Sequence, residues 1–215
     1  MKLDGQRWRM QTSHVRLGNQ TYRVVRPARP MQHAPLHTTS WNGAEICLDK
    51  PTAVELACAW WLAARSPRTL IHLPLRESPR ECGTWAKRRR LDLLLLHHSL
   101  AFPPSRWKEV RTRARLWHPH TITLPKRPFR EITAAERERT YWHQHRDTLR
   151  STIAAETLVI TGSRPAFELE GDGIAKLAQE APADIAAQPD VHVCTELDIE
   201  GIWHGLHIEI CQTHR

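Results

Sequence analysis

Residues 92–107, DLLLLHHSLAFPPSRW, contain the strand on which the predicted fold depends. Four consecutive leucines without polar alternation are typical of a strand that is covered on both faces, as in a parallel sheet. The apolar run stops at His97, His98 and Ser99, and Pro103 then introduces a helix. The stretch therefore predicts a core strand whose end meets a polar crevice.

Similar segments recur along the chain. Short runs rich in apolar and β-branched residues predict further strands at 69–75, 120–125 and 157–162. Helical patterns lie between and around them, at 50–65, 79–90, 104–117, 133–153 and 172–182. Alternating strands and helices indicate βαβ units with right-handed crossovers. The expected fold class is α/β, a three-layer Rossmann-like and mostly parallel sheet with helices on both faces and antiparallel hairpins at its N- and C-terminal ends.

The N-terminal hairpin is predicted from a two-residue turn at Gly18-Asn19, which places Val15 opposite Tyr22. The following residues, up to 44, are rich in proline and predict an irregular connection. We expect one domain in three parts. Residues 1–44 form the hairpin and connection, residues 45–190 the α/β core, and residues 191–215 a C-terminal β-hairpin.

Composition limits the possible partners and location. The net charge is +8 and favours anionic partners, nucleic acid first. Five cysteines, an odd number without CxxC spacing, do not suggest a disulfide scaffold. The N-terminal segment lacks the apolar core of a signal peptide, and no stretch is long and apolar enough for a membrane span. We therefore expect a cytoplasmic protein without membrane association.

Candidate ligand-binding residues follow the predicted strands, because open α/β sheets bind ligands beyond the carboxyl ends of their strands. His97, His98 and Ser99 follow the leucine run and are the candidate catalytic residues. The other strand ends contribute candidate anion-binding residues, namely Arg76, Lys126, Arg127, Ser163 and Arg164. Neighbouring helix N-termini would add backbone donors for an anion.

These residues predict binding of a phosphate-bearing anion, either a nucleotide or a nucleic-acid backbone. One alternative is a phosphoester hydrolase in which His97 or His98 acts as general acid-base and Ser99 as positioner or nucleophile. Another is a protein-interaction subunit of a larger assembly. The chain has no GxGxxG, Walker or GxSxG motif, and no cofactor is predicted. The sequence does not decide whether the protein is an enzyme.

A basic surface is a second place for nucleic acid. One cluster ends the predicted helix at 79–90, where the helix dipole also favours cations, and the other lies off the apolar stripe of the helix at 104–117. The residues are Lys87, Arg88, Arg89, Arg90, Arg106, Lys108, Arg111, Arg113 and Arg115.

The C-terminal hairpin allows a prediction of register. A turn at Glu200-Gly201 places the apolar residues of both strands on one face, because a slip of one residue would reverse the faces. Cys194 then lies opposite His207, and His192 and Cys211 share their face. These four residues could hold a metal, but CxxC pairs are absent and we do not predict a metal site.

Overall fold

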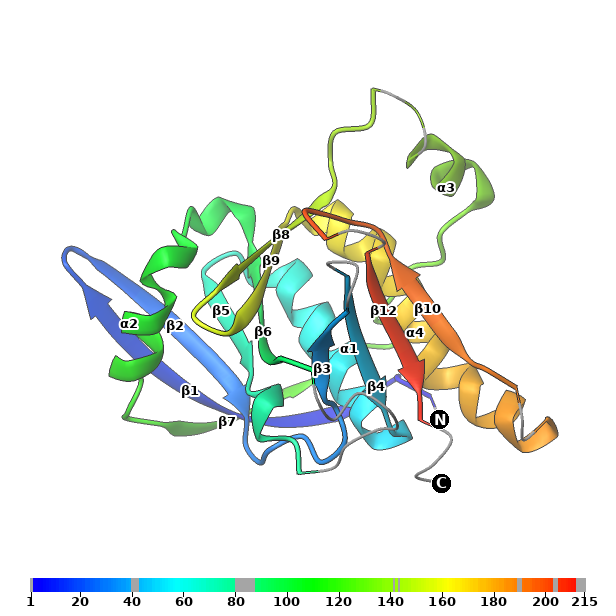
Figure 1. Cartoon of the computed structure of the whole chain (residues 1–215), viewed down its shortest axis with the longest axis horizontal. Helices are drawn as coiled ribbons and strands as arrows, with labels where there is room; N and C mark the ends of the chain where they lie inside the picture. Colours follow the sequence, from blue (N-terminus) through cyan, green and yellow to red (C-terminus); the bar gives the residue numbers. More distant parts are fainter. Residues whose placement is uncertain are drawn as a thin grey trace.

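The protein is described by a computed structural model that covers residues 2–39, 43–79, 88–140, 142, 144–188, 191–202 and 205–211. Its strands assemble into one large mixed sheet with helices (Figure 1). The strands are β1 (Arg7–Leu17), β2 (Gln20–Pro27), β3 (Leu36–Thr38), β4 (Ala44–Leu48), β5 (Thr69–Leu73), β6 (Arg90–His97), β7 (His118–Thr123), β8 (Leu149–Ala154), β9 (Thr157–Gly162), β10 (Cys194–Leu197), β11 (Ile199–Glu200) and β12 (Leu206–Ile210). The helices are α1 (Lys50–Arg65), α2 (Trp107–Arg113), α3 (Ala134–Thr140) and α4 (Arg164–Ala187).

The combination of a large sheet with helices confirms the α/β class. The sheet is mostly antiparallel, so the mostly parallel Rossmann-like arrangement is not confirmed. Its main path runs β10-β12-β4-β3-β6-β5-β2-β1-β7. Strand β9 pairs with β6 and β8, and β11 pairs with β8. Among the described residues, seven strand pairs are antiparallel and four are parallel.

The leucine run of β6 is buried on both faces, as predicted, although its neighbours are not all parallel. Leu93 and Leu95 belong to the core that α1 and α4 cover. Leu94 and Leu96 belong to a second core on the other face, where Trp107 of α2 also packs. A continuous apolar run therefore indicates that layers cover both faces of the strand. It does not indicate whether the neighbouring strands are parallel or antiparallel.

Helices α1 and α4 lie side by side over one face of the sheet (Figure 1). As predicted, α1 begins after Asp49, whose carboxylate accepts a 2.9 Å hydrogen bond from Thr52 N. The indole Nε1 of Trp60 donates to Phe167 O of α4 at 2.8 Å. A Cβ at Gly171 of α4 would lie 2.9 Å from the ring of Phe129, so glycine allows the close packing there.

The two hairpins differ in how well the sequence predicted them. The N-terminal register is confirmed, with Val15 opposite Tyr22. The C-terminal register is displaced by two residues, so that Cys194 lies opposite Glu209 instead of His207. The reason is that β11, at the expected turn, leaves the hairpin and pairs in parallel with β8. Both registers keep the apolar residues on one face, which is why the pattern alone did not separate them.

Several predicted helices have other bounds. The capping box at Thr133 is present, since Glu136 N donates to Thr133 Oγ1 at 3.2 Å, but α3 ends at Thr140. Residues predicted to continue it form β8, where Ile153 is exposed. Helix α4 begins at the cap Ser163, earlier than predicted, and continues beyond Pro182. Helix α2 ends at Arg113, and most of the helix predicted at 79–90 lies outside the described residues.

Strand β7 is confirmed as a strand, but it pairs with β1 at the edge of the sheet and is antiparallel to it. None of the helices in the described part of the chain is long and apolar enough to cross a membrane.

Candidate functional site

Because the strands run in different directions, the residues of the predicted crevice lie at two opposite edges of the sheet. Edge here means a side of the sheet at which strands begin or end, and not an outermost strand. Strands β6 and β9 are parallel, with His97 opposite Gly162, so both end at the same edge. Strand β5 is antiparallel to β6, and Arg76 after it therefore lies at the opposite edge. Strand β7 is likewise antiparallel to β1, and Arg127 N donates to Asp4 before the start of β1. Arg76, Lys126 and Arg127 do not join the histidines.

The strand-end site consists of His97, His98, Ser99, Asp147 and Ser163. Nδ1 of His97 lies 2.8 Å from Ser99 Oγ and accepts a 3.2 Å hydrogen bond from Ser99 N. The rings of His97 and His98 meet edge to face with centroids 4.7 Å apart. On the neighbouring strand end, Ser163 Oγ donates to Asp147 at 2.7 Å and caps α4 by accepting from Ala166 N.

The pKa of His97 is lowered, by its partial burial and by the neighbouring imidazole of His98, against the opposing effect of the Asp147 carboxylate. The imidazole of His97 is therefore neutral at neutral pH. Since Nδ1 already accepts from the backbone of Ser99, its lone pair is directed toward the serine. A neutral imidazole in this position can take a proton from a hydroxyl group.

Two clefts flank the strand-end site. The larger is about 500 Å³ and contains Ser99, and the smaller is about 170 Å³ and contains Asp147. The larger is lined by Gln20, Thr21, Tyr22, Pro67, Arg68, Ser99 and Leu100. The smaller is lined by Arg130, Glu136, Arg139, Thr140, His145, Asp147, Pro165 and Leu169. A volume of several hundred Å³ is in the range of small-ligand sites.

Electrostatics favours the larger cleft for an anion. None of the described residues that line it is acidic, and Arg68 is exposed at its wall. The smaller cleft contains two carboxylates, and its Arg130 is paired with Glu136 at 2.7 Å. Arg164, a predicted ligand-binding residue, is exposed at the start of α4 and paired with Glu168 at 2.8 Å.

Sequence reasoning missed Arg68 and Asp147. Both precede strands that are antiparallel to β6 or β9, so they lie at the edge where β6 and β9 end. In the mostly parallel sheet predicted from the sequence, only the residues that follow strands would lie at the ligand-binding edge. Knowledge of the strand directions would have identified both residues.

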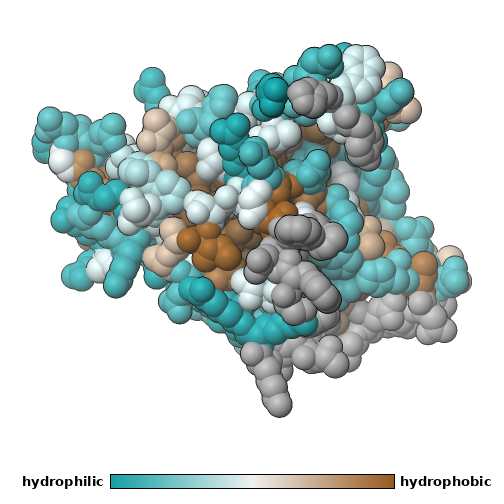
Figure 2. Space-filling model, turned by 45° about the horizontal axis from the view of Figure 1, so that its top comes forward, coloured by the Kyte–Doolittle hydropathy of each residue, from teal (hydrophilic) through white to brown (hydrophobic). Residues whose placement is uncertain are grey.

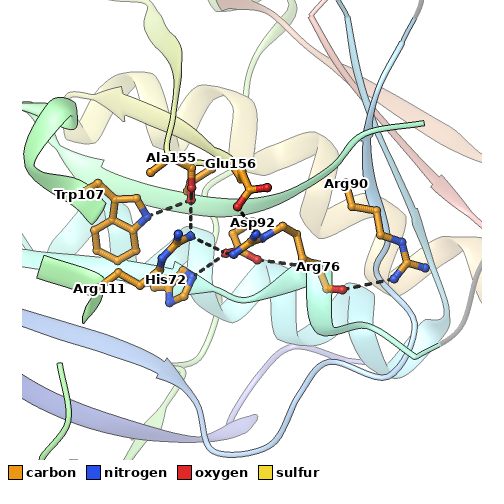
Figure 3. Close-up of polar contacts among 9 residues, drawn as sticks. His72, Arg76, Arg90, Asp92, Trp107, Arg111, Ala155 and Glu156 are labelled. Carbon is orange, nitrogen blue, oxygen red and sulfur yellow. Dashed lines mark hydrogen bonds and ion pairs between the residues drawn. The ribbon is translucent and has the colours of Figure 1, made fainter. Parts of the chain in front are cut away.

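A buried charge network lies at the opposite edge, beside the start of β6. Asp92 is 2% exposed, and Figure 3 shows His72, Arg76 and Arg111 directed toward it. Its Oδ2 lies 3.0 Å from Arg76 Nη2, 3.1 Å from Arg111 Nη1 and 3.5 Å from His72 Nε2. Burial would raise the pKa of Asp92, but the bonds from His72 and Arg76 outweigh it and hold the pKa below its usual value.

Arg76 and Arg111 therefore neutralise an internal carboxylate. Arg76 also pairs with Glu156 at 2.5 Å, and Arg111 donates to Thr157 Oγ1 at 3.3 Å. Burial lowers the pKa of His72, whose ring packs edge to face on Trp107. This geometry is typical of a structural network. The sequence instead predicts Arg76 in a ligand crevice and Arg111 on a basic surface.

Other predicted nucleic-acid contacts are on the surface. Lys108, Arg113 and Arg115 are exposed on or just after α2, and Arg106 and Arg113 share Glu109 at 2.7 and 2.8 Å. Arg90 donates to the backbone oxygens of Arg76 and Ser78. Arg88 is half-buried and Arg89 exposed. Lys87 lies outside the described residues.

The predicted metal cluster is brought together in part. The ligand atoms of His192, Cys194 and His207 all lie within 4.8 Å of one another, whereas Cys211 belongs to a different group. Hydrogen bonds with Glu209 and Glu196 raise the pKa of His207 to about 9, against the effect of burial. His207 is therefore protonated at neutral pH and forms an ion pair with Glu196.

Comparison of the chain with protein-family models, curated proteins and solved structures gives no match. The function is therefore inferred from the residues and their geometry.

Proposed function

We propose that the protein binds a phosphate-bearing anion, a nucleotide or a nucleic-acid backbone, at the strand-end site. The observation that carries the proposal is the common end of the parallel strands β6 and β9, which brings His97–Ser99 beside the start of α4. Such an edge is where open sheets bind ligands, and a helix N-terminus favours negative charge. The larger cleft opens at Ser99 and supplies Arg68.

The residues have separate roles in this proposal. Arg68 provides the charge that pairs with a phosphate oxygen, and the Ser99 hydroxyl and His98 ring provide hydrogen bonds. Arg164 contributes from the start of α4, although Glu168 shares its charge. Asp147 holds Ser163 and so fixes the end of β9 beside the site.

The test compares two variants that remove the same charge. Arg68→Ala removes a cation from the larger cleft, and Lys126→Ala removes one from the opposite edge. The probes are ATP, labelled single-stranded DNA and labelled duplex, titrated at about 50 and 200 mM salt. We expect Arg68→Ala to weaken binding about tenfold, as for one charged hydrogen bond, and Lys126→Ala to have little effect.

The salt dependence separates the two sources of phosphate. A nucleic-acid backbone that contacts several cations gives a steep loss of affinity with salt, whereas a small nucleotide gives a shallower one. Equal losses in the two variants would contradict the proposal, because they would indicate only general charge attraction. Absence of binding to all three probes at low salt would also contradict it.

A second candidate function, phosphoester hydrolysis, is favoured by the 2.8 Å contact between His97 Nδ1 and Ser99 Oγ. This is the distance of a nucleophile and its base. The hydroxyl proton would pass to His97 Nδ1 as Ser99 Oγ attacks phosphorus. The bond to the leaving oxygen would break, and His97 would pass its proton to that oxygen to release the alcohol. Water would then hydrolyse the phosphoserine and restore the Ser99 hydroxyl.

Hydrolysis is tested with a p-nitrophenyl phosphate monoester and the corresponding diester. His97→Ala should lower kcat by about 100-fold or more, because it removes the base. Ser99→Ala should do the same if the hydroxyl is the nucleophile. His120→Ala, an exposed change on β7, is the control and should retain most of kcat. A wild-type protein inactive on both esters, or a fully active His97→Ala variant, would exclude this function.

The interaction-subunit alternative has no comparable support. The large hydrophobic side chains exposed among the described residues are Leu116, Trp142 and Ile153, from separate segments. The face in Figure 2 is mainly hydrophilic, with hydrophobic residues gathered near its centre. A protein partner and a cytoplasmic location stay predictions.

A further inference from the structure

Three ligand-type side chains meet in the interior, away from the strand-end site. His33, Cys47 and Cys211 are 0%, 2% and 4% exposed, and their ligand atoms all lie within 4.8 Å of one another. Cys47 Sγ and His33 Nε2 are 4.0 Å apart. We name this group the buried Cys-His cluster.

The sheet itself aligns the two cysteines. Strands β4 and β12 are parallel, with Cys47 opposite Glu209. Cys211 N, just after β12, donates to Leu48 O at 2.7 Å. Because side chains alternate along a strand, Cys47 and Cys211 point to the face opposite Ile46 and Ile208. Those isoleucines pack in the core under α1 and α4.

His33 reaches this face from the connection before β3. The connection is fixed to a distant segment, since Ala34 N donates to Ser78 Oγ at 3.0 Å and that hydroxyl lies 3.3 Å from Gln32 O. The cluster thus joins the connection to two strands that are far apart in sequence. A metal ion bound there would cross-link all three segments.

The surroundings of the cluster favour a metal ion. On this face Cys47 and Cys211 form a core cluster of only two buried hydrophobic residues among those described. Two sulfurs and an imidazole are the donors that structural zinc prefers, and a site closed from water is typical of structural rather than catalytic zinc.

We propose that His33, Cys47 and Cys211 are ligands of a structural Zn²⁺ ion. They supply three of the four positions of a tetrahedral site. The ion would hold the proline-rich connection against β4 and β12. This site is separate from the strand-end site and does not depend on the proposed phosphate binding.

Zinc binding at this cluster requires the reduced form of Cys47. Cys47 is disulfide-bonded in this structure, to a cysteine other than Cys211, and only a thiolate is a zinc ligand. Zinc and the disulfide therefore exclude each other. A phosphine such as TCEP cleaves the S–S bond, taking up the oxygen of a water molecule to give a phosphine oxide and two thiols. Each ligating thiol then loses its proton on binding Zn²⁺.

The exposed cluster of His192, Cys194 and His207 supplies a control on the same sheet face. Cys194 on β10 and His207 on β12 belong to it, and it contains a single sulfur. The buried Cys-His cluster contains two. The number of thiolates on a bound metal therefore distinguishes the two clusters.

The experiment begins with full-length protein purified in TCEP, supplied with Zn²⁺ and freed of excess metal. We expect stoichiometric zinc in the wild type and in Cys194→Ser, and its loss from Cys211→Ser and His33→Ala. Retention of zinc in both Cys211→Ser and His33→Ala would overturn the proposal. So would loss of zinc from Cys194→Ser alone, or a wild type that takes up no zinc after reduction.

A second measurement needs no variant and so does not depend on variant folding. Reduced wild-type protein is titrated with Co²⁺, whose near-ultraviolet sulfur-to-metal absorption increases with the number of thiolates. Absorption of at least two thiolates per ion is expected from Cys47 and Cys211. A spectrum of one thiolate would assign the metal to Cys194 and overturn the proposal. Without TCEP, the intact disulfide should reduce the uptake of Co²⁺.

Discussion

At the scale of single residues, the charges inside the molecule were the least predictable from the sequence. The basic residues on and just after α2 predict a solvated face, and Arg113 and Arg115 fit that prediction. Arg111 is different, because its guanidinium group reaches Asp92 beneath the helix. An isolated aspartate at the start of an apolar strand was the available signal, since a buried carboxylate requires a partner.

Replacing Arg111 tests the buried network. Arg111→Ala leaves Asp92 with fewer hydrogen bonds in a buried place, and we expect a loss of about 2–3 kcal/mol in the free energy of unfolding. Arg113→Ala, on the exposed side of the same helix, should change it by less than about 0.5 kcal/mol. Urea unfolding measures both. Equal effects would show that Arg111 does not support Asp92.

Glu170 predicts a pH dependence of stability. Burial raises its pKa to about 7, while a hydrogen bond from Asp198 N opposes the shift. The folded state therefore holds a proton that the unfolded state releases near pH 4 to 5. The stability that this protonation gives to the folded state is complete below the pKa of the unfolded state, and it is lost as the pH rises through about 7.

Glu170→Gln should therefore be more stable than the wild type at pH 8, by on the order of 2 kcal/mol, with a much smaller difference at pH 4.5. Thermal unfolding at several pH values measures the difference. Glu180→Gln, an exposed change on the same helix, is the control. A difference that does not vary with pH would contradict the burial of an ionisable Glu170.

At the scale of elements, the sequence predicted the strands and the pairing within the N-terminal hairpin. It did not predict which strands that are distant in sequence pair with one another. The Gly18-Asn19 turn fixed the register of β1 and β2 correctly. The C-terminal hairpin obeys the same alternation, yet β11 pairs with β8, which is distant in sequence. Local patterns contain no information on such a partner, and the prediction of Cys194 opposite His207 was wrong for that reason.

The connection between β10 and β12 depends on a glycine. Gly205 has φ +72°, and a Cβ there would lie 2.2 Å from Leu197 O. Gly205→Ala should lower the free energy of unfolding by more than about 2 kcal/mol, because backbone would have to move. Gly18→Ala has a similar φ, +58°, but no atom within 4 Å, and should cost about 1 kcal/mol. Equal losses measured by urea unfolding would contradict the clash.

At the scale of the whole molecule, the sequence predicted the α/β class and the strand that divides the two cores. It did not predict the mixed sheet, because burial on both faces of β6 has the same sequence pattern whether neighbours are parallel or antiparallel. For the same reason, the residues predicted to form one site lie at two edges of the sheet. His97–Ser99 and Ser163 share one edge because β6 and β9 are parallel, and Arg76 and Lys126 lie elsewhere.

The most direct test of the strand-end site is an amide NMR titration of the full chain with ATP. We expect the perturbed signals to concentrate at Arg68, His98, Ser99, Gly162 and Arg164. Signals around Lys126 and Arg127, at the opposite edge, should stay in place. Perturbations centred on that opposite edge, or no perturbation at millimolar ATP, would contradict binding at the common end of β6 and β9.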